Sequence, residues 1–170
     1  MNNEQTGNLN LARFLATHQP FALAILRGSE RYPDIRGRVM LYPMNDRNTI
    51  VVSRFEGLPV DEKTCAQRFF ALHIHDGTAC TGDSQDPFKN AGMHYNPEGC
   101  PHPSHAGDLP PIFSTQGRIA WSAVLTDRFS AQEVLGKAVI LHRQPDDFHT
   151  QPSGNAGEKI ACGVIERVYR

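Results

Sequence analysis

Apolar and polar residues alternate in short runs along most of the chain, which is the period of β-strands. Turn-forming residues such as Tyr32-Pro33-Asp34 separate these runs. Only Asn8–Thr17 has a helical period, with its apolar residues on one face. The pattern predicts strands at Phe21–Arg27, Ile35–Tyr42, Thr49–Glu56, Arg68–His75, Gly117–Leu125, Lys137–Arg143 and Ile160–Val168. Regularly spaced strands with little helix favour an all-β fold, a Greek-key barrel or sandwich of about eight strands with a short N-terminal helix.

Two long segments, Asp76–Phe113 and Gln144–Ser153, interrupt this spacing. Loops of the first size are seldom structureless in a compact domain and are usually functional. A metal ion or a disulfide is the natural way to order such a loop. A chain of 170 residues suits one domain. We expect residues 1–19 to form an N-terminal extension and residues 20–170 to form the barrel.

Charge and hydropathy exclude some partners. The 17 basic side chains nearly balance the 18 acidic ones, which gives no support for a nucleic-acid partner. No apolar run approaches the length of about 18 residues that a membrane-spanning helix needs, so we expect no membrane partner. The N-terminus lacks the basic and apolar regions of a secretory signal, which favours a cytoplasmic location.

Histidine and cysteine are unevenly distributed. Five of the eight histidines lie between positions 73 and 105, and three of the four cysteines lie in or beside that stretch. A single histidine is usually a surface or core residue, and we interpret His18 and His149 in that way. A cluster of histidine, cysteine and aspartate in one segment is instead the raw material of a metal site.

The spacing of these residues supports metal binding. Side chains alternate along a strand, so His73 and His75 share one face, with Cα atoms about 7 Å apart. His94, His102, His105 and Asp108 form a complete tetrahedral set of nitrogen and oxygen donors of the kind that zinc accepts. His142 ends a predicted strand, where it could join the pair on the earlier strand.

From Phe70 to Ile165 the motifs follow a familiar order. They are His73-Ile74-His75, Asn90-Ala91-Gly92-Met93-His94-Tyr95-Asn96-Pro97, His105-Ala106-Gly107-Asp108-Leu109-Pro110, His142 with Asp146-Asp147, and Gly154-Asn155-Ala156-Gly157-Glu158-Lys159-Ile160-Ala161-Cys162-Gly163. In this order they resemble the Cu,Zn superoxide dismutase family. The earlier predicted strands fit the family's barrel less distinctively.

The resemblance implies a role for each matching residue. The copper ligands would be His73, His75, His94 and His142, and the zinc ligands would be His94, His102, His105 and Asp108. His94 would bridge both metals and supply a proton. Asp146 would be the carboxylate that links a copper histidine to a zinc histidine, and Cys80 and Cys162 would form the family's disulfide.

Some features depart from the family pattern. Lys159 stands where the family usually has an arginine beside the copper, so it would still attract an anion but lacks the planar fork. The zinc loop and the polar segment after His142 are both short. Cys65 and Cys100 fit a second disulfide, two free thiols, or Cys100 as an opportunistic metal ligand. Disulfides would also suit a location outside the cytoplasm.

The resemblance implies an oxidoreductase that dismutates superoxide to oxygen and hydrogen peroxide. Copper would change oxidation state and zinc would hold the geometry, since only copper of this pair is redox-active. The expected partners are the superoxide anion and a second copy in a homodimer. The alternative is a non-enzymatic protein that stores or delivers copper and zinc on the same fold.

Overall fold

The computed structural model describes residues 10–60, 63 and 67–169. These residues form one short α-helix, α1 (Leu11–Thr17), a single 3₁₀ turn, η1 (Lys89–Ala91), and antiparallel strands. The strands are β1 (Ala22–Gly28), β2 (Arg36–Pro43), β3 (Thr49–Glu56), β4 (Phe69–His75), β5 (Asp108–Phe113), β6 (Ala120–Thr126), β7 (Ala138–His142) and β8 (Lys159–Arg167).

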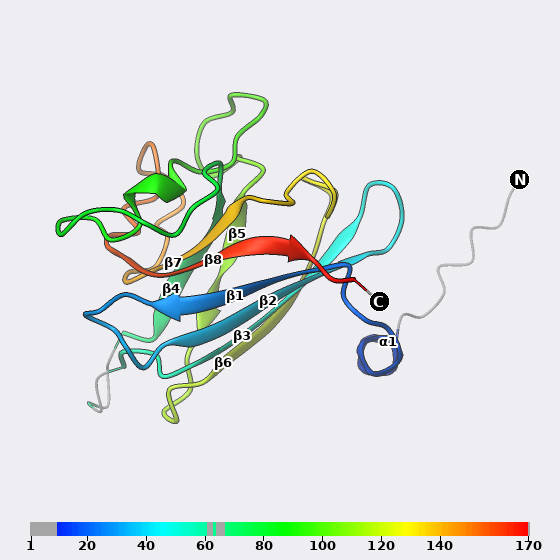
Figure 1. Cartoon of the computed structure of the whole chain (residues 1–170), viewed down its shortest axis with the longest axis horizontal. Coiled ribbons are helices and arrows are strands. Elements are labelled where there is room, and N and C mark those ends of the chain that lie inside the picture. Colours follow the sequence, from blue (N-terminus) through cyan, green and yellow to red (C-terminus); the bar gives the residue numbers. More distant parts are fainter. Residues whose placement is uncertain (1–9, 61–62, 64–66, 170) are drawn as a thin grey trace, which may run out of the picture.

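The sheet curls into a nearly closed barrel (Figure 1). Its strand order is β5-β4-β7-β8-β1-β2-β3-β6, so β5 and β6 are the two edges. A short connection brings these edges together, with a bridge between Ser114 and Ala120 and a hydrogen bond from the Thr115 amide to the Ile119 carbonyl. The expected all-β barrel with a short N-terminal helix is confirmed.

Among the strands of the described residues, β5 is the one that the hydrophobic pattern does not predict. It lies inside the segment that we expected to be a loop, and it contains Pro110 and Pro111. Proline has no amide hydrogen, and within sheets it is confined mainly to edge strands. β5 is such an edge, because its ladder is with β4 alone. The two adjacent prolines therefore mask the strand in the sequence pattern. They are tolerated because the outer side of an edge strand needs few backbone amide donors.

The barrel interior is filled by the inward-facing apolar side chains of the strands, among them Leu26, Leu41, Phe55, Phe70, Leu72 and Ile74. Outside the barrel, α1 lays Leu11, Phe14 and Leu15 against a second apolar cluster on β2 and β3. Asn10 caps this helix by accepting a hydrogen bond from the Arg13 amide. Trp121 of β6 is 57% exposed.

The long loop after β4 and the segment between β7 and β8 lie side by side at one end of the barrel, drawn in green and orange in Figure 1. A disulfide between Cys80 and Cys162 ties the long loop after β4 to β8. This covalent link holds the loop against the strands that carry the site described below. None of the described helices is long and apolar enough to cross a membrane.

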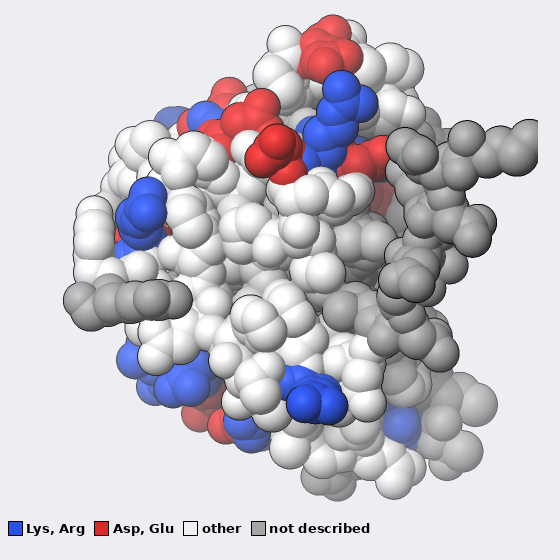
Figure 2. Space-filling view, turned by 90° about the vertical axis from the view of Figure 1, so that its right-hand side faces the viewer, with Lys and Arg blue, Asp and Glu red and all other residues white. Residues whose placement is uncertain are grey.

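The face in Figure 2, turned toward the right-hand side of Figure 1, carries charges of both signs. Acidic groups gather toward its upper part, and basic groups are scattered around an uncharged middle.

Candidate metal centre

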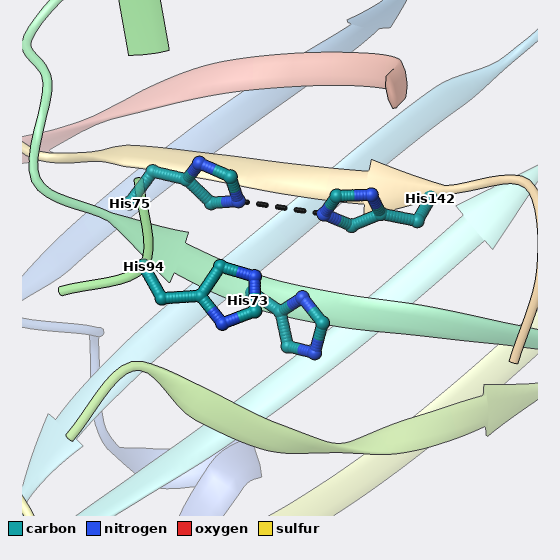
Figure 3. A group of neighbouring side chains, drawn as sticks. All are labelled: His73, His75, His94 and His142. Carbon is teal, nitrogen blue, oxygen red and sulfur yellow. Dashed lines mark hydrogen bonds between the residues drawn. The ribbon is translucent and has the colours of Figure 1, made fainter. Parts of the chain in front are cut away.

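Four buried histidines converge at the loop end of the barrel. His73 and His75 project from β4, His142 ends β7, and His94 comes from the long loop, where it forms an isolated bridge with His75. Their rings point toward one another (Figure 3). One ligand atom from each residue can be chosen so that all lie within 4.8 Å of one another. We call these residues the four-histidine cluster.

Backbone carbonyls fix which ring nitrogens face this cluster. Nδ1 of His75 donates to the carbonyl of Gly92 at 2.9 Å, and Nδ1 of His142 donates to the carbonyl of Gly157 at 3.2 Å. A neutral imidazole that donates through one nitrogen offers a lone pair on the other. The two Nε2 atoms lie 3.4 Å apart, as the dashed line in Figure 3 marks. Two electron-pair donors therefore point into the same space.

A second group, which we call the mixed cluster, lies directly beside the first. It contains His94, His102, His105 and Asp108, and its ligand atoms also fall within 4.8 Å of one another. The Nδ1 atoms of the three histidines lie 2.7, 3.1 and 3.4 Å from the Asp108 carboxylate, in the order of the chain. His94 belongs to both clusters, with one ring nitrogen available to each.

Asp146 joins the two clusters from behind. One carboxylate oxygen lies 2.8 Å from Nε2 of His73 and the other lies 2.8 Å from Nε2 of His102. The amide of Phe148 donates to the same carboxylate at 2.7 Å. Gly154 packs so closely that an added Cβ would overlap both Asp146 and His102. The position of the carboxylate is thus fixed by the backbone around it.

Three buried ring nitrogens have no hydrogen-bond partner in the part of the chain that the structure describes. They are Nδ1 of His73, Nε2 of His94 and Nδ1 of His102, the last of which lies near Asp108 but forms no hydrogen bond with it. A buried polar atom without a partner costs about 1–3 kcal/mol. These atoms belong to the two clusters, so bound metal ions would give each of them a partner. An all-imidazole set suits copper, and imidazoles with one carboxylate suit zinc, so the residues present fit both ions.

The comparison with known families agrees with this donor set. A family model described as copper/zinc superoxide dismutase (SODC) matches residues 35–165, which is most of the chain.

The chain belongs to the copper/zinc superoxide dismutase family.

Copper and zinc are the cofactors of this family, and the two clusters fit them. Several curated relatives are named as Cu-Zn superoxide dismutases, which are oxidoreductases.

Individual relatives cover most of the chain at modest identity. Superoxide dismutase [Cu-Zn] 2 of Aquifex aeolicus is 31% identical over 146 residues, covering 78% of this chain and 80% of that protein. The extracellular superoxide dismutase [Cu-Zn] of Rattus norvegicus is 31% identical over 143 residues, and the chain spans only 55% of its length. A solved structure, the clock protein EA4, superposes with a TM-score of 0.71 at 27% identity, covering 89% of this chain and 97% of that one.

Burial favours the neutral form of three histidines of the four-histidine cluster, His73, His75 and His142. It lowers the pKa of His73 and lowers that of His75 further, and it lowers the pKa of His142 to about 3. Burial opposes ionisation of Asp108 and Asp146, but hydrogen bonds from the neighbouring imidazoles and amides outweigh it and lower the pKa of both carboxyl groups. Neutral imidazole and ionised carboxylate are the forms that bind metals.

Lys159 begins β8, where its backbone pairs with His142 across the β7–β8 ladder. Its ammonium group makes an ion pair with Asp86, at 2.8 Å from the carboxylate. Nothing in the spacing of the sequence indicates this partner, because the two residues are far apart in the chain and Asp86 lies in an irregular loop. Only the fold of the loop, held by the disulfide, brings them together.

The remaining histidines and cysteines have different outcomes. His18 and His149 are exposed and lie outside both clusters. Cys100 is of intermediate burial and has no disulfide partner among the described residues. Cys65 lies outside those residues, so the pairing of Cys65 with Cys100 stays a prediction. Cys100 is in neither cluster.

Proposed function

We propose that this chain is a superoxide dismutase, converting two superoxide anions and two protons into oxygen and hydrogen peroxide. The observation that carries the proposal is the pair of clusters that share His94. A protein built to bind a single ion would need only one of them. In this proposal His73, His75, His94 and His142 hold copper, while His94, His102, His105 and Asp108 hold zinc in a structural role.

When bound, copper supplies one-electron redox chemistry, and zinc supplies positive charge without changing its oxidation state. The chain's own residues provide the geometry. Asp146 accepts from His73 and His102 and keeps both rings turned so that Nδ1 faces its cluster. The carbonyls of Gly92 and Gly157 do the same for Nε2 of His75 and His142. Such outer contacts orient the ligands of metal sites generally.

His94 is the residue proposed to move a proton. Its Nδ1 lies 2.7 Å from Asp108, whereas its buried Nε2 has no hydrogen-bond partner among the described residues. A proton held on Nε2 therefore faces the four-histidine cluster, where the anion would arrive. Lys159, across the strand pair from His142, is the cation proposed to attract that anion.

The direct test is superoxide consumption by protein reconstituted with copper and zinc, measured by stopped-flow absorbance. We expect activity in the wild type, loss of activity in His75→Ala, and full activity in His149→Ala, which alters an exposed histidine outside both clusters. Full copper occupancy in a wild-type protein without activity would contradict the proposal and leave metal storage or delivery as the function.

The homodimer, the cytoplasmic location and the domain boundaries stay predictions. Size-exclusion chromatography with light scattering would test whether the protein is a homodimer.

A further inference from the structure

Lys159 is engaged within the protein. Its ammonium group donates to the Asp86 carboxylate at 2.8 Å and to the carbonyl of Phe88 at 3.3 Å. An ammonium group has three donors, so two of them are directed into this loop. The lysine side chain is only 16% exposed. The positive charge of Lys159, a residue whose backbone pairs with that of His142, therefore has a negative partner at contact distance.

The Asp86 carboxylate is hydrogen-bonded within its loop. Its other oxygen accepts from the Phe88 amide at 3.1 Å, and its own amide donates to the Asp83 side chain at 3.0 Å. Its backbone carbonyl accepts from the amides of Asp83 and Lys89. The carboxylate thus has two partners, the Phe88 amide and the Lys159 ammonium group, and the backbone of Asp86 is held by further hydrogen bonds.

The loop that carries Asp86 is in turn fastened to the barrel. Phe88 is buried in a small apolar cluster with Ile140 of β7 and Cys162 of β8. The Cys80–Cys162 disulfide joins the start of the same loop to that strand. Asp86 is thus kept beside the beginning of β8, where Lys159 lies.

Glu158, the acidic residue next to Lys159 in the chain, has other partners. Glu158 accepts from the Tyr32 hydroxyl at 3.0 Å and lies 3.5 Å from the Arg31 guanidinium. Its negative charge therefore faces Arg31, which lies in the connection between β1 and β2. Among the described residues, Asp86 is the carboxylate that pairs with Lys159.

We propose that Asp86 sets the affinity of the four-histidine cluster for small anions by compensating the charge of Lys159. This inference rests on the proposed function, since it concerns how that site attracts its anionic substrate. An approaching anion is drawn by the ammonium group and repelled by the carboxylate, so the pair attracts it less than a single positive charge would. Replacing Asp86 with an uncharged residue of the same shape would leave the attraction unopposed.

The test uses azide as a probe anion on protein reconstituted with copper and zinc, with binding followed by the visible absorption of the metal. We expect Asp86→Asn to raise azide affinity about tenfold at low salt, and less at high salt, as partly screened charges require. Lys159→Met should lower the affinity, and the double variant should return close to the wild type. Unchanged or lower affinity in Asp86→Asn would overturn the proposal.

Asp83→Asn is the matched control. It removes the same charge from the same loop, but Asp83 pairs with Lys89 rather than with Lys159. We expect azide affinity to change by less than about twofold, because this pair is solvent-exposed and screened. A rise equal to that of Asp86→Asn would show a general charge effect and would overturn the specific role.

A second readout needs no metal. In metal-free protein, trace acetylation of Lys159 measured by mass spectrometry should increase severalfold in Asp86→Asn, because the ammonium group loses its partner. Equal labelling of both proteins would show that Asp86 does not restrain Lys159 and would overturn the proposal. Superoxide consumption by the wild type is scored separately, so a protein without dismutase activity whose azide affinity still rises in Asp86→Asn would refute the proposed function and not this inference.

Discussion

The four-histidine cluster and the mixed cluster share His94 but are built in different ways. The first takes three of its residues from β4 and β7, and backbone carbonyls orient two of its rings. The second takes its residues from the long loop and from Asp108 at the start of β5. Its rings surround a carboxylate, so negative charge is concentrated on that side of His94.

This difference indicates that the two clusters have different roles. Imidazoles mounted on paired strands and kept neutral by burial make a rigid site in which the ligands add no charge. A carboxylate in the neighbouring site offsets part of the charge of a bound dication. Asp146 is the element common to both, because it contacts one histidine from each cluster. Variants that act on one cluster, on Asp146 or on the buried imidazoles should therefore have distinct effects.

The largest effect is expected from removing one ligand from each cluster in turn. His142→Ala should abolish copper binding and leave zinc bound, because His142 belongs to the four-histidine cluster alone. Asp108→Asn should weaken zinc binding and leave copper bound. Loss of a residue that only contacts a metal ligand weakens binding by up to about 100-fold, so loss of Asp108, a proposed ligand itself, should weaken zinc binding by more than that. Metal analysis after dialysis against a chelator measures both. Loss of both metals in either variant would refute the separation of the two clusters.

A smaller effect, on both clusters together, is expected from Gly154→Ala. The added Cβ would overlap Asp146 and His102, so the carboxylate must move away from both histidines. Loss of such an outer contact lowers metal affinity by about 10- to 100-fold. Competition with a chromophoric chelator measures the affinity of each metal.

Gly136→Ala is the matched control for backbone strain. Gly136 has φ +78°, against +65° at Gly154, and nothing lies within 4 Å of its added Cβ. We expect metal affinities equal to those of the wild type. A similar loss in both variants would assign the effect to strain rather than to Asp146.

The smallest effect concerns acid stability of the metal-free protein. Burial places the pKa of His142 at about 3, against 6.5 for the unfolded residue. Between these values the unfolded chain binds a proton that the folded chain does not, so stability falls as the pH is lowered. From pH 7 to pH 5, His142 alone should contribute a loss of about 2 kcal/mol. Urea unfolding at both pH values measures it, and no change would contradict the burial of neutral imidazoles.

The strand-borne part of the site was the most predictable from the sequence. The alternation of His73 and His75 with apolar residues places both on one face of a strand, and His142 ends another strand. These are local patterns, and the backbone period decides them. Strand β5 was missed for the opposite reason, because Pro110 and Pro111 give no local sign of a strand and only its place at the sheet edge makes them acceptable.

The contacts between loops were the least predictable. The period of the chain says nothing about where Asp146 lies, and its place between the clusters was expected only from the resemblance to the family. The ion pair of Asp86 with Lys159 had no signal at all, because it depends on how a disulfide-linked loop packs on the barrel. The long-range packing of irregular segments cannot be predicted from any short stretch of sequence.

The central claim is that two different metal ions bind on either side of His94. Anomalous diffraction from crystals of the reconstituted protein, recorded at the copper and zinc absorption edges, tests it most directly. We predict a copper peak among His73, His75, His94 and His142, and a zinc peak among His94, His102, His105 and Asp108. A single peak, or peaks away from these residues, would contradict the account.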